Sequence, residues 1–390
     1  MVIMQRKVKQ LHTLGLCIVF IFSMVAHSHT ANAQPIEKQQ RLAVFTPTTE
    51  GNTYWPEVHK IMKAAAEDLG IQIYFYEFDV GDRFSKKERG VEILKQEPIP
   101  DAAIFSVAFG QAKPLVEAAD ELNIPFFIQG PLFPDELEEL GDIPRKKIEN
   151  WIGYFHQDEV EKGYLLGKAL IEEAIRHERF AADGTVHVAG VGGDTSWFGS
   201  NLREEGLRKA IAETPMAQLM QTVPTRWTPS EGRDMTWRLL QRYPEVSVVW
   251  AASDQLALGV VEALGAIGHT PGETIFTGGL DLSMVGLAAI QTGELTATAA
   301  SSMLMYAEIV VYLYDYLQGI DFADEKGTKI KTKVYLTDAA TADSFIKLQQ
   351  MYLHLDFTDF SRYHNKSLSH YDFSLRRVQK YAEARKGATQ

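Results

Sequence analysis

The segment that most constrains the fold is residues 41–70, because it predicts a strand, a polar loop and a helix in immediate succession. Residues 42–45 are apolar and suit a buried strand, whereas residues 46–53 are polar. Two adjacent aromatic residues, Tyr54 and Trp55, come next, and apolar residues then recur every three or four positions. That period is typical of an amphipathic helix, so the polar loop joins the end of a strand to the start of a helix.

A second apolar strand, Ile71–Phe75, follows the helix directly and completes a β-loop-α-β unit. In an open parallel sheet, ligands bind at the carboxyl ends of the strands, and the loop before Tyr54 lies at such an end. Tyr54 and Trp55 therefore have two interpretations. They either pack against the loop or contact a ligand at the end of the sheet.

The composition agrees with a globular chain that can bury a large core. Hydrophobic residues make up 45% of the 390 residues and charged residues 23%, and this length favours two domains or lobes. The formal net charge of -12 argues against broad binding to nucleic acids or to anionic membranes.

The first 33 residues predict a signal peptide. Residues 6–9 include three basic side chains, residues 14–26 form an apolar run, and Ala31-Asn32-Ala33 offers small residues for cleavage. We therefore expect the mature chain to begin near Gln34. The apolar run is too short for a comfortable permanent membrane span.

The single cysteine of the chain, Cys17, lies inside this apolar run. The residues before it fit a lipoprotein signal poorly, so a lipid anchor is the less favoured interpretation. The mature protein should then contain neither a disulfide nor thiol chemistry. No later stretch is long and apolar enough to cross a membrane. These features predict an exported, soluble protein in the periplasm.

Predicted strands and helices alternate along most of the mature chain, which is the pattern of parallel, doubly wound sheets. After the opening unit we predict strands at 102–107, 124–128, 151–155, 186–191, 220–223, 246–251, 274–278, 296–300 and 332–336. Residues 131–147 lack a sustained period and predict an exposed excursion, after which the alternation restarts. Two successive copies of one α/β pattern indicate two similar lobes.

The opening unit resembles the start of the type I periplasmic binding proteins, in their sugar-binding group. The resemblance rests on the strand, the polar loop with Asn52, the aromatic pair, the Ala-rich helix and the ending Leu69-Gly70. It implies an α/β fold of two similar doubly wound parallel-sheet lobes, joined by three hinge crossings.

By the same resemblance, we expect the crossings near Gly130, Ser301 and Leu336. The N-terminal lobe would comprise residues 41–130 with 302–335, and the C-terminal lobe residues 131–301 with 336–390. Residues 337–390 form a longer tail than the family requires. We expect this tail to pack on one lobe or to be partly loose.

The segment Ser253–Gly259 follows a predicted strand and opens a helix. In the resembled family, a polar pair at this place meets ligand hydroxyls, and the pair here is Ser253 and Asp254. Either side chain can also cap the helix. We expect one of the two to reach the ligand and Asp254 to serve as a cap as well.

Asp281 matches a family position at which an aspartate after a strand binds sugar hydroxyls. An ionised carboxylate accepts two hydroxyl hydrogen bonds, each stronger than a neutral one. Asp281 also stands at a predicted helix start, where an acidic cap is ordinary. Of these two roles we favour ligand contact.

Arg203 stands at the start of a helix after the loop 192–200, where the family places an arginine that forms a fork to ligand oxygens. Trp227 follows a strand where sugar-binding relatives place a ring, and a flat aromatic face packs on the apolar face of a sugar or on a ligand cation. Trp55 is the next candidate for such a ring, and Trp197 is a weaker one. The alternatives are a solvated arginine and ordinary packing of the rings.

Two positions depart from the ribose-binding pattern. Ala108-Phe109-Gly110 stands where relatives have an acidic-basic pair, and Ser301 stands at a crossing usually held by glutamine or arginine. Both changes remove polar groups, so we expect a more aromatic and less polar pocket than a ribose site. The opening motif and Arg203 also resemble the autoinducer-2 receptor branch. Gly279 and Ser301 replace that branch's tryptophan and arginine, which argues against autoinducer-2 itself.

The predicted ligand-binding residues are Asn52, Tyr54, Trp55, Phe109, Gln129, Arg203, Trp227, Ser253, Asp254, Asp281 and Ser301. The chain has no Gly-x-Ser-x-Gly elbow, phosphate-binding glycine loop or His-Glu-x-x-His motif, so we predict no catalysis. The 11 histidines are scattered without metal-ligand spacing, and we predict no metal and no cofactor.

We therefore predict a periplasmic solute-binding protein that closes over a small polar ligand, a sugar or sugar-like molecule, and serves an ABC-type importer. Its expected partners are that ligand and the inner-membrane permease, and we expect a monomer that binds no nucleic acid. The alternative is a sensory co-receptor that presents its ligand state to a membrane histidine kinase. An enzyme on this scaffold has no supporting motif. A lac-repressor relative would carry DNA-binding helices where the signal peptide stands.

Overall fold

The computed structural model describes residues 39–78, 83–108 and 110–388, with the backbone alone at residues 83–86, 382 and 385–388. The predicted signal peptide and Phe109 lie outside these described residues. Within the described part of the chain, no helix is both long and apolar enough to cross a membrane.

The first lobe is built on a six-stranded parallel sheet with the strand order β11-β5-β4-β3-β1-β2. Its strands are β1 (Arg41–Pro47), β2 (Gln72–Phe78), β3 (Ala102–Ser106), β4 (Phe126–Gln129), β5 (Trp151–Gln157) and β11 (Lys329–Thr332). Its helices are α1 (Trp55–Asp68), α2 (Arg83–Lys95), α3 (Ala112–Glu121), α4 (Pro134–Leu140), α10 (Leu304–Leu317) and α11 (Ala323–Lys326).

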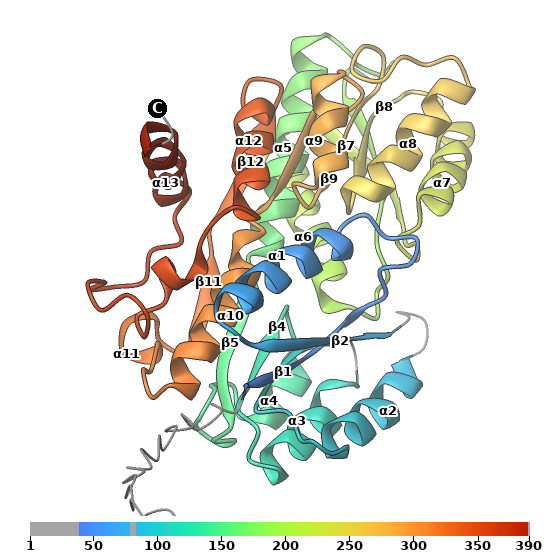
Figure 1. Cartoon of the computed structure of the whole chain (residues 1–390). Helices are drawn as coiled ribbons and strands as arrows, with labels where there is room; N and C mark the ends of the chain where they lie inside the picture. The colour runs from blue at the N-terminus through green and yellow to red at the C-terminus, as the bar shows by residue number, and fades with distance from the viewer. Residues whose placement is uncertain (1–38, 79–82, 109, 389–390) are drawn as a thin grey trace, which may run out of the picture. The chain divides into compact units, whose positions relative to one another are not determined.

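Helices cover both faces of this sheet, as Figure 1 shows. Successive side chains of a strand point to opposite faces, and β1 follows this rule. Leu42 and Val44 are buried in the core that contains α1 and α10. Ala43 and Phe45 are buried in a second core with residues of α2 and α3. Burial on both faces explains the unbroken apolar run that predicted this strand.

The second lobe repeats the plan around the strand order β12-β10-β9-β8-β6-β7, in which β12 alone runs antiparallel to its neighbour. Its strands are β6 (Val186–Val191), β7 (Ala217–Val223), β8 (Val246–Ala251), β9 (Phe276–Leu280), β10 (Ala297–Ser301) and β12 (Val334–Asp338). Its helices are α5 (Glu159–Arg176), α6 (Phe198–Ala212), α7 (Pro229–Arg242), α8 (Asp254–Ala266), α9 (Met284–Gln291) and α12 (Ala342–Tyr352). The predicted fold class of two similar doubly wound lobes is confirmed.

Helices α5 and α6 approach each other at two glycines. A Cβ added at Gly163 would lie 1.9 Å from the main-chain oxygen of Arg203, and one at Gly206 would lie 2.1 Å from that of Val160. Real Cβ atoms do not come so close, so any other residue would push the helices apart. The contact brings the start of α6, with Arg203, against the start of α5.

The first crossing between the lobes follows Gln157, not Gly130 as predicted. Strand β5 pairs in parallel with β4, with Ile128 opposite Tyr154, so it belongs to the first sheet. The sequence pattern marked the restart of the alternation but not the sheet that receives the strand. The second crossing falls between Ser301, which ends β10, and α10.

The third crossing falls at Lys333 rather than near Leu336. The single strand predicted at 332–336 is two strands, because β11 pairs with β5 of the first sheet and β12 pairs with β10 of the second. Leu336 lies within β12, opposite Ala299.

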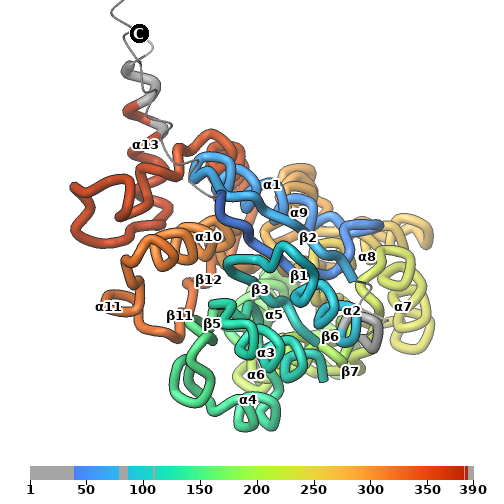
Figure 2. Tube along the Cα trace, turned by 60° about the horizontal axis from the view of Figure 1, so that its bottom comes forward, coloured from blue at the N-terminus to red at the C-terminus, as the bar shows by residue number. Residues whose placement is uncertain are grey.

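The tail crosses between the lobes a fourth time, which the sequence did not predict. Helix α12 packs against α9 of the second lobe, and the chain then returns to the first lobe. The 3-10 turn Phe357–Phe360 and helix α13 (Leu375–Ala388) follow. Phe357, Phe360 and Tyr371 are buried in one core with α1 and α10, and Figure 2 shows this segment beside both helices. The expectation that all of 336–390 belongs to the C-terminal lobe is therefore wrong.

A buried carboxylate holds the returning tail. Asp315 of α10 is fully buried, and it accepts hydrogen bonds from the Arg362 main-chain N–H at 2.7 Å and the Tyr371 hydroxyl at 2.8 Å. The Ser361 hydroxyl donates to it as well. A buried carboxylate with several donors is stabilising only while all of them stay in place, so Asp315 fixes the tail to α10.

Replacing Asp315 should therefore loosen the tail. We expect Asp315→Ala to lower the free energy of unfolding by about 2–4 kcal/mol, because it leaves buried donors unpaired. Urea unfolding would measure the loss, and limited proteolysis should show faster cleavage after residue 353. Asp359→Ala, an exposed aspartate of the same tail, should change stability by no more than about 0.5 kcal/mol. Equal losses in the two variants would contradict the anchoring role.

Candidate functional site

A cavity of about 600 Å³ lies between the two lobes, at the carboxyl ends of strands from both sheets. This is the place where doubly wound sheets bind ligands. Predicted residues on its wall are Asn52, Tyr54, Trp55, Gln129, Arg203, Trp227, Ser253 and Asp281. The structure thus brings together eight predicted side chains that the sequence spreads over more than 200 positions.

The wall formed by the first lobe is mainly aromatic. The rings of Tyr54, Trp55 and Tyr306 contact one another edge to face, with centroids 5.5 to 6.2 Å apart. The Asn52 side-chain oxygen accepts from the main-chain N–H groups of Tyr54 at 2.8 Å and Trp55 at 3.0 Å. Asn52 therefore holds the start of α1 in place and still lines the cavity with the rest of its amide.

The wall formed by the second lobe is organised around Arg203, which is 6% exposed. Its Nε donates to Glu159 at 2.6 Å, and its Nη1 donates to the main-chain oxygen of Ala252 at 2.6 Å. The rings of Trp197 and Trp227 lie over the guanidinium, at 5.0 and 5.8 Å from their centroids. Arg203 is thus neither solvated nor free, and it ties α5, α6 and the end of β8 to the two rings.

Two further ionisable groups complete this buried cluster. Lys162 donates to Glu159 at 2.9 Å, and Asp281 lies 3.6 Å from the Arg203 Nη1. Burial raises the pKa of Asp281 and lowers that of Lys162, while the opposite charges of Arg203 and Glu159 act against these two shifts. The cluster pairs two acidic groups with two basic ones, so it brings no excess of formal charge to the cavity.

Ser253 and Asp254 have separate roles. Ser253 accepts from the Leu256 N–H at 3.2 Å, as a helix cap, and lines the cavity. Asp254 is fully buried and accepts from the Ser283 N–H and hydroxyl, each at 2.8 Å, and from the Thr298 hydroxyl at 2.6 Å. It does not line the cavity, so its predicted ligand contact is replaced by a structural role that joins α8, α9 and β10.

The Asp254 carboxylate also explains why residue 279 is a glycine. A Cβ at Gly279 would lie 2.4 Å from the Asp254 Oδ1, so no side chain fits there.

Ser301 also lies away from the cavity wall. Its hydroxyl accepts from the Thr332 hydroxyl at 2.7 Å, beside the hinge. Phe109, the remaining predicted residue, is outside the described residues.

Several lining residues were not predicted. Tyr306 comes from α10, about 250 positions after the loop it contacts, and nothing in that apolar helix distinguishes it. Gln157 ends β5, so it would have been a candidate if the strand had been assigned to the first sheet. Gln255 follows the Ser253-Asp254 pair directly and is the one residue that the motif itself could have suggested.

Gln255 joins the lobes at the edge of the cavity. Its side-chain oxygen accepts from the Thr53 N–H at 2.9 Å. Its amide nitrogen donates to the main-chain oxygens of Gly51 at 2.8 Å and Trp227 at 3.0 Å. A single side chain therefore connects the first loop of one lobe to the tryptophan loop of the other.

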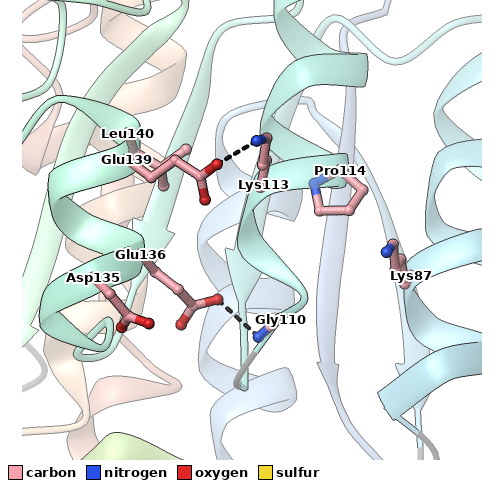
Figure 3. Close-up of a pocket in the computed structure, with 8 residues that line it drawn as sticks. All are labelled: Lys87, Gly110, Lys113, Pro114, Asp135, Glu136, Glu139 and Leu140. Atoms are coloured by element: carbon pink, nitrogen blue, oxygen red, sulfur yellow. Dashed lines mark hydrogen bonds and ion pairs between the residues drawn. The ribbon is translucent and has the colours of Figure 1, made fainter.

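A second hollow, of about 320 Å³, lies on the first lobe between α3 and α4. Figure 3 shows its charged side chains facing one another: Lys113 pairs with Glu139, and the Gly110 N–H donates to Glu136 at 2.8 Å. These groups satisfy each other, and residues of one lobe alone line the hollow. We therefore assign ligand binding to the cavity between the lobes. Among the described residues, no three acidic, histidine or cysteine side chains gather into a metal site.

Comparison with known proteins defines the class. Residues 43–321 match the family described as periplasmic binding protein domain, so the chain belongs to the periplasmic binding protein family. It is 22% identical to the galactofuranose-binding protein YtfQ of Escherichia coli over 72% of this chain and 83% of that protein. It is 23% identical to the ribose import binding protein RbsB of Salmonella typhimurium over 80% of this chain and 94% of that protein.

Solved structures agree with the fold. The crystal structure of a periplasmic sugar-binding protein from Pseudomonas fluorescens superposes with a TM-score of 0.76 at 25% identity. The match covers 87% of this chain and 99% of that one. The predicted resemblance to this family is confirmed, and its members are non-catalytic solute-binding proteins.

The contact between Glu57 and α9 predicts that the separation of the lobes depends on pH. Glu57 accepts from the Met284 N–H at 3.3 Å, across the lobes, and burial raises its pKa from 4.5 to about 7. Separating the lobes would return the carboxyl to water and to its ordinary pKa. The closed form thus holds a proton that the open form releases between about pH 4.5 and 7. Acid should favour closure, and this contribution should be lost as the pH rises through 7.

Small-angle X-ray scattering of the protein without sugar tests this predicted pH dependence of lobe separation. The radius of gyration of the unmodified protein should be larger at pH 8 than at pH 5, and Glu57→Gln should remove most of the difference. Glu67→Gln, on the exposed side of the same helix, should keep it. A pH dependence that survives unchanged in Glu57→Gln would rule this contact out.

Proposed function

We propose that this protein captures a neutral, hydroxyl-rich sugar between its two lobes in the periplasm and delivers it to an ABC-type importer. The observation that carries the proposal is the chemistry of the cavity wall. The buried charges of that wall compensate one another. Glu50, Asp194 and Arg226 also line the cavity but lie on its less buried parts, and aromatic rings, amides and hydroxyls make up most of the rest. Aromatic faces suit the apolar face of a sugar ring, and the polar groups suit its hydroxyls.

A charged ligand fits this wall less well. An anion would have to compete with Glu159 for Arg203, and a cation would have to compete with Arg203 for Asp281. Removing either buried partner would leave an unpaired charge, which costs several kcal/mol (about 3–5). A neutral ligand leaves these pairs intact and can still donate to Asp281 and accept from Arg203.

The relatives support the same class of ligand. Two of them are named for binding galactofuranose and ribose, and the Pseudomonas structure is described as a sugar-binding protein. Six aromatic residues line the cavity: Tyr54, Trp55, Phe78, Trp197, Trp227 and Tyr306. This composition agrees with the predicted shift to a more aromatic pocket.

Binding would require closure of the lobes. Asn52, Trp55 and Gln129 would contact the sugar from the first lobe, and Arg203, Trp227, Ser253 and Asp281 from the second. Neither set alone completes the site, so the sugar would stabilise the closed arrangement by binding it more tightly than the open one. The closed form is the state that a membrane permease could distinguish from the empty protein. Removal of the predicted signal peptide near Ala33 would release the mature protein into the periplasm.

The first experiment is a screen of the mature chain, residues 34–390, by thermal shift with D-ribose, D-galactose, D-allose, L-arabinose and myo-inositol. At least one of these polyols should raise the melting temperature, and glutamate and lysine at the same concentration should not. Stabilisation by the charged amino acids alone would overturn the proposal of a neutral ligand.

Trp227 provides the sharpest single-residue test. With the best sugar of the screen, Trp227→Ala should weaken binding by about tenfold or more, whereas Trp227→Phe should retain much of it, because an aromatic face remains. Isothermal titration calorimetry would measure both. Trp237→Ala, an exposed ring on α7, should bind like the unmodified protein. A large loss of apo stability with unchanged affinity in Trp227→Ala would show that the ring only packs.

A further inference from the structure

Four side chains of the first wall form one hydrogen-bonded chain. The Ser106 hydroxyl donates to the Gln129 Oε1 at 2.8 Å, and the Gln129 Nε2 donates to the Tyr306 hydroxyl at 3.3 Å. The hydroxyls of Tyr306 and Tyr54 lie 2.9 Å apart. All four residues line the cavity, and they come from β3, β4, α10 and the loop before α1.

The amide of Gln129 gives this chain a direction. An amide has one end that can only donate and one that can only accept, whereas a hydroxyl can do either. The Tyr306 oxygen receives the Gln129 N–H. If it also received the Tyr54 hydrogen, the buried Tyr306 hydrogen would have no acceptor within the chain, so the Tyr306 hydrogen goes to the Tyr54 oxygen. The hydrogen of Tyr54 then has no place within the chain and is left for the cavity.

Burial prevents the hydrogen bonds of this chain from reversing their direction. Ser106, Gln129 and Tyr306 are only 8%, 7% and 2% exposed. Water therefore has little access to replace a lost partner, and a buried donor left unpaired is costly. Burial also raises the pKa of Tyr54 and of Tyr306, so both phenols keep their hydrogens.

We infer that Gln129 is a positioning residue for recognition: it sets the direction of the chain so that Tyr54 offers a hydrogen to an oxygen of the bound molecule. This inference rests on the proposed function and narrows it. The group bound at Tyr54 must be an acceptor, such as a sugar hydroxyl or ring oxygen. An ammonium group has no lone pair and is refused there.

The opposite wall of the cavity requires a hydrogen-bond donor on the ligand. Asp281 belongs to the second lobe and lines the same cavity as Tyr54. A carboxylate accepts, so the molecule between these residues must accept at one end and donate at the other. Neighbouring hydroxyls of a sugar do both. Tyr54 and Asp281 thus require opposite hydrogen-bond roles from one ligand.

Gln129→Glu tests the direction. A carboxylate accepts at both ends, so Tyr306 would turn its hydrogen towards residue 129 and Tyr54 would turn its hydrogen towards Tyr306. The cavity then loses its donor although every other side chain of the hydrogen-bonded chain is unchanged. Gln157→Glu is the matched control, because it adds the same charge to the same cavity at the end of the next strand, outside the chain.

Affinity is measured at pH 8 by titration calorimetry with D-ribose, D-galactose, D-allose, L-arabinose and myo-inositol. We expect Gln129→Glu to weaken binding by about tenfold or more, Gln157→Glu to weaken it clearly less, and Tyr54→Phe to match Gln129→Glu. Tyr306→Phe should lose less than Tyr54→Phe, since Tyr54 keeps its hydroxyl. Equal losses in the two glutamate variants, or a larger loss in Tyr306→Phe, would overturn the inference.

Melting temperatures without sugar test the chain independently. In the unmodified protein Tyr54→Phe leaves the buried Tyr306 hydrogen unpaired, whereas in the Gln129→Glu variant the new carboxylate already accepts that hydrogen. Tyr54→Phe should therefore lower the melting temperature more in the first background than in the second. Equal shifts would refute the directed chain even if sugars bind. Unequal shifts with no sugar binding would support the chain and refute the proposed function.

Discussion

The buried pair between Arg203 and Glu159 is the interaction on which the site depends. It forms because Gly163 and Gly206 let α5 and α6 approach until main-chain atoms nearly touch. Arg203 then reaches the end of β8 and stands beneath Trp197 and Trp227, so one side chain orients the loops of three strands. A buried pair is strongly destabilising to break but adds little net stability, so its role here is to place groups.

The buried charges at the cavity are paired within the second lobe, and the first lobe contributes mainly neutral groups. The first wall supplies rings, amides and hydroxyls that are bonded to one another along the chain from Ser106 to Tyr54. The lobes also meet through Gln255, at the edge of the cavity, and through Glu57, which does not line it. Contacts between the lobes are therefore made both at the cavity and beside it.

The alternation of apolar segments was enough to predict two doubly wound lobes, because burial on both faces of a parallel sheet leaves continuous apolar runs in the sequence. It did not show to which sheet β5 belongs, nor that residues 329–338 divide between two sheets. Those choices depend on pairing between strands far apart in the chain, which no local period records. The return of the tail to the first lobe could not be predicted either, because Asp315 binds residues about 50 positions later in the chain.

At the site, local sequence predicted Asn52 and Trp55 from their loop at the carboxyl end of a strand. The resemblance to the family predicted Arg203, Trp227 and Asp281, and all five residues line the cavity. It also offered two adjacent polar residues, Ser253 and Asp254, and only the tertiary structure separated the residue on the wall from the one in the core. Their side chains leave the helix start in different directions, and one meets buried donors from α9 and β10. Tyr306 shows most clearly what local sequence cannot predict. It is a tyrosine in an apolar helix, and only folding brings Gln129 and Tyr54 within hydrogen-bonding distance of its hydroxyl.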